Sequence, residues 1–89
     1  MITIYKYCLT QPTTEFLDLP VGARLLRGGW CPIEGRLCFW ALVDTDCALK
    51  RKVTVKAVLT GEETDAQVMT YLDTVRVDAL VFHLFYFYN

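Results

Sequence analysis

The sequence predicts a mainly β domain, a small antiparallel barrel or sandwich of six to seven short strands with at most one short helix. Three observations lead to this prediction. Short segments rich in β-branched and aromatic residues recur along the chain, turn-forming residues separate them, and no segment sustains the apolar stripe of an amphipathic helix. The 89 residues show no internal repeat and no linker, so we expect one β domain over residues 1–89.

The first half of the chain contains four expected strands, which cover residues 2–9, 15–19, 23–30 and 36–44. Pro20 ends the second strand, since proline cannot donate to a ladder. The pair Gly28-Gly29 indicates a bulge or a bend in the third. Residues 37–43 are apolar without a break, which is typical of a strand buried on both faces. We therefore expect the 36–44 strand to lie centrally, with Trp40 in the core.

The second half predicts three further strands, at residues 52–60, 71–77 and 80–88. The first of these alternates between apolar and polar residues, as in a half-buried strand. Residues 61–69 are the one stretch that could form a helical turn, which Thr64 could cap. Asp78-Ala79 joins the last two strands closely, as in a tight hairpin.

Composition and charge narrow the function classes. Hydrophobic residues make up 54% of the chain, above the usual ~45–50%, which allows a dense core and leaves apolar surface for an interface. The net charge of −1 argues against direct nucleic-acid binding and against electrostatic docking on anionic lipid. No apolar run approaches the ~20 residues that cross a bilayer, and residues 1–7 lack the pattern of a signal peptide. We expect a cytoplasmic protein without membrane contact.

The candidates for metal binding and catalysis are few. The cysteines are Cys8, Cys31, Cys38 and Cys47, and none forms the close Cys-x-x-Cys pair that is typical of zinc sites. We expect them to be reduced, small hydrophobic residues, with no metal and no cofactor. His83 could in principle serve a cysteine nucleophile, but a strand histidine satisfied by a neighbouring backbone group or carboxylate is the preferred interpretation. We therefore expect no catalytic residues and no enzyme.

The charged clusters each have two interpretations. Glu62, Glu63 and Asp65 form either a solvated loop or an acidic patch that occupies a basic groove on a partner. Lys50, Arg51 and Lys52, with Lys56, either form the solvated start of a strand or blunt an edge strand, or they contact phosphate. Trp30, beside a loop, is either half-buried core or an interface hot spot.

The last expected strand points most directly to assembly. One face carries Leu80, Phe82, Leu84 and Tyr86; the other carries Val81, His83, Phe85 and Phe87. A small monomer has too few residues to cover both apolar faces of this strand. A terminal apolar strand with a free edge can also pair with a strand of another chain. We therefore expect a homodimer or a heteromeric contact anchored by Phe85, Phe87 and Tyr88. The alternative is a strand buried on both faces within a closed barrel.

Several short motifs carry a resemblance across nearly the whole chain. In order they are Ile4-Tyr5-Lys6-Tyr7, Leu19-Pro20-x-Gly22-Ala23, Trp40-Ala41-Leu42-Val43-Asp44, Thr60-Gly61 and Leu80-Val81-Phe82-His83. The chain resembles a family of small uncharacterised proteins encoded by phages, prophages and bacteria. The resemblance implies no enzymatic activity. The chain departs from it at Glu62, where that family usually has histidine, and at Val77-Asp78-Ala79, where it has a glycine-rich hairpin.

Small size, the absence of a catalytic pattern, surplus apolar residues and this resemblance lead to one functional hypothesis. We expect a non-enzymatic protein-binding module of phage origin that inhibits a host antiviral system in the manner of an anti-CRISPR protein. Its partner would be a host protein, a CRISPR–Cas or other defence component. Two alternatives stay open: a small-ligand or nucleotide-sequestering protein that uses Lys50, Arg51, Lys52 and Trp30, and a structural phage component.

Overall fold

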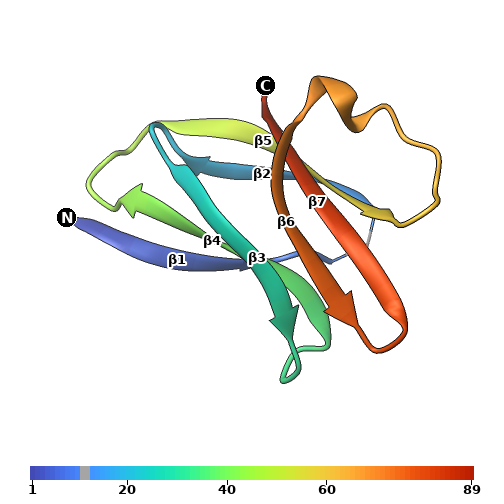
Figure 1. Ribbon diagram of the computed structural model, residues 1–89. Helices are drawn as coiled ribbons and strands as arrows, with labels where there is room; N and C mark the ends of the chain where they lie inside the picture. The colour runs from blue at the N-terminus through green and yellow to red at the C-terminus, as the bar shows by residue number, and fades with distance from the viewer. Residues whose placement is uncertain (11–12) are drawn as a thin grey trace.

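The computed structural model describes residues 1–10 and 13–89, and within them seven strands form two antiparallel sheets (Figure 1). The first sheet has the order β1-β4-β3, with β1 (Ile2–Cys8), β4 (Arg36–Asp44) and β3 (Arg24–Cys31). The second has the order β2-β5-β7-β6, with β2 (Thr14–Pro20), β5 (Lys50–Leu59), β7 (Leu80–Tyr88) and β6 (Thr70–Val77). The mainly β prediction is confirmed, and each expected strand lies within two residues of its predicted ends.

The single helical element is also close to expectation. Among the described residues it is one 3₁₀ turn, η1 (Ala66–Val68), in the connection from β5 to β6. The expected cap by Thr64 is wrong, because Asp65 is the N-cap residue and no side chain caps the turn; the Thr64 hydroxyl accepts a hydrogen bond from the Ala66 N–H at 3.0 Å, one residue too early. No helix in the described part of the chain is long and apolar enough to cross a membrane.

The two sheets do not close into a barrel. They meet where β3 runs beside β6, and there side chains rather than a backbone ladder join the strands. The Asp73 carboxylate on β6 accepts hydrogen bonds from the Gly28 N–H at 3.1 Å and from the Arg27 side chain at 3.4 Å. A β-bulge on each strand, at Leu26 and at Leu72, accompanies this junction. The expected bulge at Gly28-Gly29 is therefore wrong, because the ladder shifts register before that pair.

Asp73→Asn is expected to lower the free energy of unfolding by about 1 kcal/mol, because a charged acceptor bonds roughly twice as strongly as a neutral one. Urea denaturation followed by circular dichroism measures the change. Asp18→Asn is the matched control, since Asp18 is exposed on the outer strand β2 and should leave stability unchanged. Equal stability of the two variants would contradict the role given to Asp73.

The core lies between the facing sides of the two sheets. Its fully buried members include Phe39 and Val43 on β4, Val53 and Val55 on β5, and Leu84 on β7. These residues alternate with outward-facing neighbours, as the two-residue period of a strand requires. Each sheet therefore turns one apolar face inward and one mixed face outward.

The expected burial of Trp40 in the core is wrong. Leu37, Phe39, Ala41 and Val43 face the second sheet, so Trp40, at an even position, faces the opposite way. Its indole is half-buried and lies over Gly29, where an added Cβ would come within 2.9 Å of the ring. Gly29 thus supplies the room that Trp40 needs on the outer face. Phe39, one residue earlier, takes the core position.

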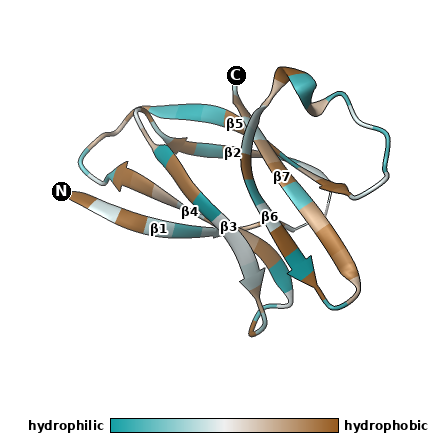
Figure 2. Ribbon diagram, in the orientation of Figure 1, coloured by the Kyte–Doolittle hydropathy of each residue, from teal (hydrophilic) through white to brown (hydrophobic). Residues whose placement is uncertain are grey.

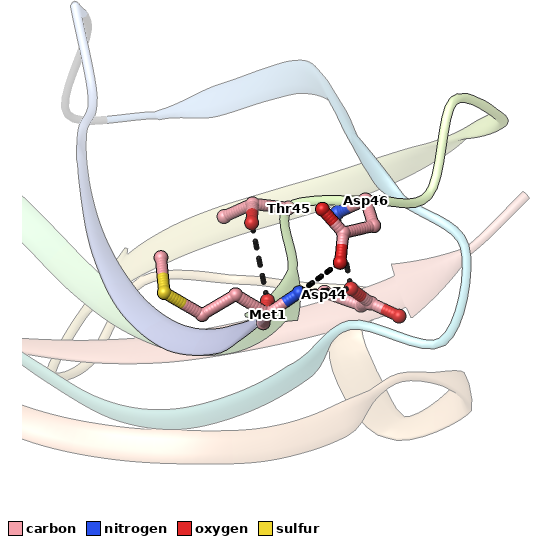
Figure 3. A network of polar contacts seen from close by, with 4 residues as sticks. All are labelled: Met1, Asp44, Thr45 and Asp46. Atoms are coloured by element: carbon pink, nitrogen blue, oxygen red, sulfur yellow. Dashed lines mark hydrogen bonds and ion pairs between the residues drawn. The ribbon is translucent and has the colours of Figure 1, made fainter.

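Polar contacts hold the start of β1 to the end of β4 (Figure 3). The Met1 ammonium group binds the carboxylates of Asp44, at 3.2 Å, and Asp46. The Met1 carbonyl accepts hydrogen bonds from the Thr45 backbone N–H at 2.8 Å and from its hydroxyl at 3.2 Å. These bonds extend the β1–β4 pairing by one residue. They help to keep β1, which has a ladder partner on one side, in register.

Candidate functional site

Four aromatic side chains gather on the outer face of the second sheet. Thr54 on β5 lies opposite Phe16 on β2 and Phe87 on β7, so these three side chains form one row across the sheet. In the adjacent row, Phe85 on β7 lies between Lys56 on β5 and Tyr71 on β6. We call Phe16, Tyr71, Phe85 and Phe87 the aromatic face.

The aromatic face is open to solvent. Phe16 is 64% exposed, Tyr71 55% and Phe87 50%, while Phe85 is half-buried. The rings of Tyr71 and Phe85 meet edge to face, with centroids 5.8 Å apart. Large apolar patches on small soluble domains usually mark binding surfaces. This surface is the strongest candidate for a contact with another macromolecule.

The position of β7 corrects the expectation of a free terminal edge. β7 lies between β5 and β6 and has a ladder on both sides, as Figure 1 shows. Pairing of this strand with another chain through its backbone is therefore excluded. What β7 offers is its outer face, which carries Phe85 and Phe87 as the alternation predicts.

Tyr88 does not belong to the aromatic face. It lies on the inward side of β7, where it packs against the core. Its hydroxyl donates a hydrogen bond to the Ala23 carbonyl, and the Arg51 guanidinium lies 4.9 Å from the ring centroid. Burial raises the pKa of this phenol. Tyr88 therefore joins β7 to the start of β3 and does not share a surface with Phe87.

The acidic cluster reaches the aromatic face through one residue. The Asp65 carboxylate forms an ion pair with Lys56 at 2.7 Å, and Lys56 is the cross-strand partner of Phe85. The hydrogen bond from Lys56 holds the pKa of Asp65 below its usual value. Glu62 turns back to accept a hydrogen bond from the Leu59 N–H at 3.3 Å, while Glu63 is exposed. The three acids therefore do not act as one uncompensated patch.

His83 sits in a chain of hydroxyl groups beside the aromatic face. Its Nε2 lies 2.7 Å from the Thr60 hydroxyl and its Nδ1 lies 3.1 Å from the Thr74 hydroxyl. The Thr74 hydroxyl is in turn 2.6 Å from that of Tyr71. The histidine is satisfied, as expected, although by hydroxyls and not by a backbone group or a carboxylate. His83 faces away from Cys8 and Cys38, which lie on the outer side of the first sheet, so it cannot serve them as a base.

Trp30 lies away from the aromatic face, at the end of β3. It is 38% exposed and lines an apolar cavity between the ends of the sheets, together with Leu9, Val77, Leu80 and Phe82. The cavity volume of about 210 Å³ is below the ~300 Å³ at which small-molecule sites begin. Arg51 packs on the ring of Tyr88, whose hydroxyl bonds to Ala23 at the other end of β3. Ala23 lies roughly 23 Å from Trp30 at ~3.3 Å per residue. Trp30 and the basic cluster therefore do not form one nucleotide site.

A second cluster, formed mainly by cysteines, lies on the outer face of the first sheet, and the sequence did not predict it. Cys8 on β1 and Cys38 on β4 are directly opposite, with their sulfur atoms 2.7 Å apart. The Glu34 carboxylate lies 2.7 Å from the Cys8 sulfur, and Lys6 bridges Glu34 and Cys31 at 3.6 and 3.5 Å. We call Cys8, Cys31, Glu34 and Cys38 the thiol cluster.

Local surroundings perturb the titration of these groups in opposite directions. Desolvation, together with hydrogen bonds to Cys38 and Glu34, raises the pKa of Cys8 to about 12. Backbone N–H groups of the hairpin and the Lys6 ammonium lower the pKa of Cys31. The pKa of Glu34 is lowered by the hydrogen bond from Cys8 and by Lys6. The cluster thus combines a thiol whose pKa is raised, Cys8, with one whose pKa is lowered, Cys31.

Comparison with known proteins places the whole chain in one family. A family model described as a domain of unknown function (DUF7352) matches residues 1–89. The chain belongs to this family. No curated protein and no solved structure is significantly similar to it. The two outer faces of this DUF7352 domain carry its candidate functional residues.

Two members of the aromatic face of the DUF7352 domain were absent from the candidates that the sequence suggested. Phe16 lies two residues before Asp18, so strand alternation puts both on one side of β2, and this was a signal for exposure. Tyr71 gave no such signal, because a bulge at Leu72 shifts the alternation of β6. The thiol cluster gave none in its spacing, since 30 residues separate Cys8 from Cys38.

Proposed function

We propose that this DUF7352 domain is a non-enzymatic protein-binding module that contacts its partner through the aromatic face. The observation that carries the proposal is the pair of adjacent rows on the second sheet, in which Phe16, Tyr71 and Phe87 are each at least half exposed. Aromatic residues are enriched in the centres of protein interfaces, where they bury a large area at little entropic cost. The Lys56–Asp65 ion pair and Glu63 would form a polar rim.

In its specific form, the proposal is that the module is of phage origin and inhibits a host antiviral system in the host cytoplasm. Support comes from the small size of the chain and from the short motifs that resemble phage-encoded proteins. A CRISPR–Cas component or another defence protein would then cover the aromatic face. The same face could also join two copies of the chain as a homodimer.

The aromatic face is tested by reversing its character without touching the core. Phe87→Glu places a charge on the exposed face, and Ile33→Glu, at a position 94% exposed on the β3–β4 hairpin, is the matched control. Light scattering coupled to size exclusion, at high micromolar concentration, should show a dimer for wild type and Ile33→Glu and a monomer for Phe87→Glu. All three should fold and give the same far-ultraviolet circular dichroism spectrum, because surface substitutions change stability little.

A wild type that runs as a monomer would rule out the homodimer, and the contact with a different protein would remain to be tested. Capture from host lysate then decides, with bound proteins identified by mass spectrometry. The wild type and Ile33→Glu should retain the same defence protein, and Phe87→Glu should lose it. If all three variants retain the same proteins, the aromatic face is not the contact.

A further inference from the structure

Two cysteines distant in sequence occupy a cross-strand position at which side chains approach closely. The hydrogen bond from the Leu9 N–H to the Leu37 carbonyl, at 2.8 Å, identifies Leu9 and Leu37 as a hydrogen-bonded pair. Cys8 and Cys38 are the next pair along, which is therefore non-hydrogen-bonded, with Cα atoms about 4.5 Å apart. Both sulfur atoms point to the outer face of the first sheet, because the neighbouring Leu9 and Phe39 point into the core.

The hairpin from β3 to β4 brings a carboxylate over this pair. Gly35 adopts φ +64°, a conformation that favours glycine, and its N–H donates to the Cys31 carbonyl at 2.7 Å. This turn directs Glu34 back across the sheet toward Cys8. One ligand atom from each of Cys8, Glu34 and Cys38 then lies within 4.8 Å of the other two. Cys31, which ends β3, is held near this group by Lys6.

We propose that Cys8, Cys38 and Glu34 form a binding site for a thiophilic divalent cation, with Zn²⁺ as the ion that the donor set fits best. Two thiolates and a carboxylate are ligands that zinc accepts, and three protein ligands leave a fourth position for Cys31 or water. Magnesium and calcium are disfavoured because they bind through oxygen atoms. The Lys6 ammonium, 3.6 Å from Glu34, offsets the surplus negative charge of two thiolates and one carboxylate around a divalent ion.

The site can reach zinc geometry with small movements. Tetrahedral zinc with Zn–S bonds of about 2.3 Å holds its two sulfur atoms about 3.8 Å apart. Cys38 is fully buried, whereas Cys8 is partly exposed on the outer strand β1 and Glu34 is exposed on the hairpin. Cys8 and Glu34 can therefore adjust while Cys38 stays in place. The site lies on the first sheet, so zinc binding is independent of the aromatic face on the second.

Zinc titration of the untagged, reduced, metal-free full chain tests the proposal. Competition with a chromogenic chelator gives stoichiometry and affinity, and Co²⁺ as a probe reports thiolate ligands through its charge-transfer absorption. The wild type should bind one equivalent of Zn²⁺. Cys8→Ser and Glu34→Gln should each bind at least about 100-fold more weakly, since even changes outside the ligand sphere cost 10–100-fold. Both residues are accessible enough for these variants to fold.

Cys47→Ser is the matched control. Cys47 lies in the loop between β4 and β5, where its thiol donates to the Leu49 carbonyl at 3.6 Å, and its loss should leave zinc affinity unchanged. Absence of stoichiometric zinc in the wild type would overturn the proposal. So would unaltered affinity in Cys8→Ser, or a Cys8–Cys38 disulfide that persists in reducing buffer and shields both residues from alkylation.

Discussion

Phe39→Ala is expected to lower the free energy of unfolding by about 3–5 kcal/mol, the usual cost of removing a fully buried aromatic ring. Phe39 lies at the centre of the inner face of β4 and is 0% exposed. Its ring stacks on that of Tyr7, with centroids 5.2 Å apart and an interplanar angle of 18°. Because small domains are stabilised by only about 5–15 kcal/mol in total, we expect this variant to be largely unfolded at mild urea concentrations.

Two controls separate this prediction from a general sensitivity to aromatic loss. Phe87→Ala removes the same ring from the exposed face and should cost well under 1 kcal/mol. Trp40→Ala removes a larger, half-buried ring on the outer side of β4 and should cost less than Phe39→Ala. Urea denaturation followed by far-ultraviolet circular dichroism compares all four proteins. A greater loss for Trp40→Ala than for Phe39→Ala would mean that the faces of β4 are assigned the wrong way round.

Gly28→Val is expected to destabilise the domain by about 3 kcal/mol, at the upper end of the cost of overpacking a core. Gly28 lies where the two sheets meet. A Cβ added there would come within 2.3 Å of the Leu84 Cδ1 atom and 3.4 Å of the Asp73 Cβ atom. Leu84 is 0% exposed, so its side chain has no solvent to move into. The valine would therefore force β3 and β6 apart and weaken the Gly28–Asp73 hydrogen bond.

A double-mutant cycle with Leu84→Ala shows whether this contact is the cause. Leu84→Ala alone should cost about 2–5 kcal/mol, because it leaves a cavity. In the double variant the valine would occupy part of that cavity, so the combined loss should be smaller than the sum of the two. Gly29→Val is the matched single variant: it meets the partly exposed Trp40 ring, which can move outward, and should cost less. Additive losses would show that Gly28 and Leu84 do not compete for the same space.

Much of the secondary structure could be predicted because each strand carries its own signal. The alternation of apolar and polar residues over 52–60 predicted a half-buried strand, and Val53, Val55 and Ala57 form its inward face in the structure. An unbroken apolar run such as residues 37–43 has no alternation to read, so the inward face of β4 could not be assigned. Figure 2 shows that hydrophobic residues also lie along β1, an edge strand, where Ile2 and Ile4 are 62% and 55% exposed. Hydropathy alone therefore did not predict burial there either.

The candidate site residues also divide into those that strand alternation placed and those that it did not. Phe85 and Phe87 were placed on one face from the alternation of β7, and the structure keeps them there. Tyr88 was assigned as a further anchor although alternation puts it on the inward face, where its hydroxyl bonds to Ala23. Trp30 and Asp65 were grouped with them as binding candidates, and the fold separates Trp30 and ties Asp65 to Lys56.

By itself, the sequence determined a mainly β chain, the limits of its seven strands and the position of its turns, because propensity and alternation act over a few neighbouring residues. The tertiary structure alone decided which strands pair, that β7 is an inner strand and that the sheets stay open. It also decided that Phe16, Tyr71, Phe85 and Phe87 share one face, and that Cys8, Glu34 and Cys38 meet on the other sheet. These contacts join residues far apart in the chain, and their register depends on how two apolar faces pack together, which no local pattern encodes.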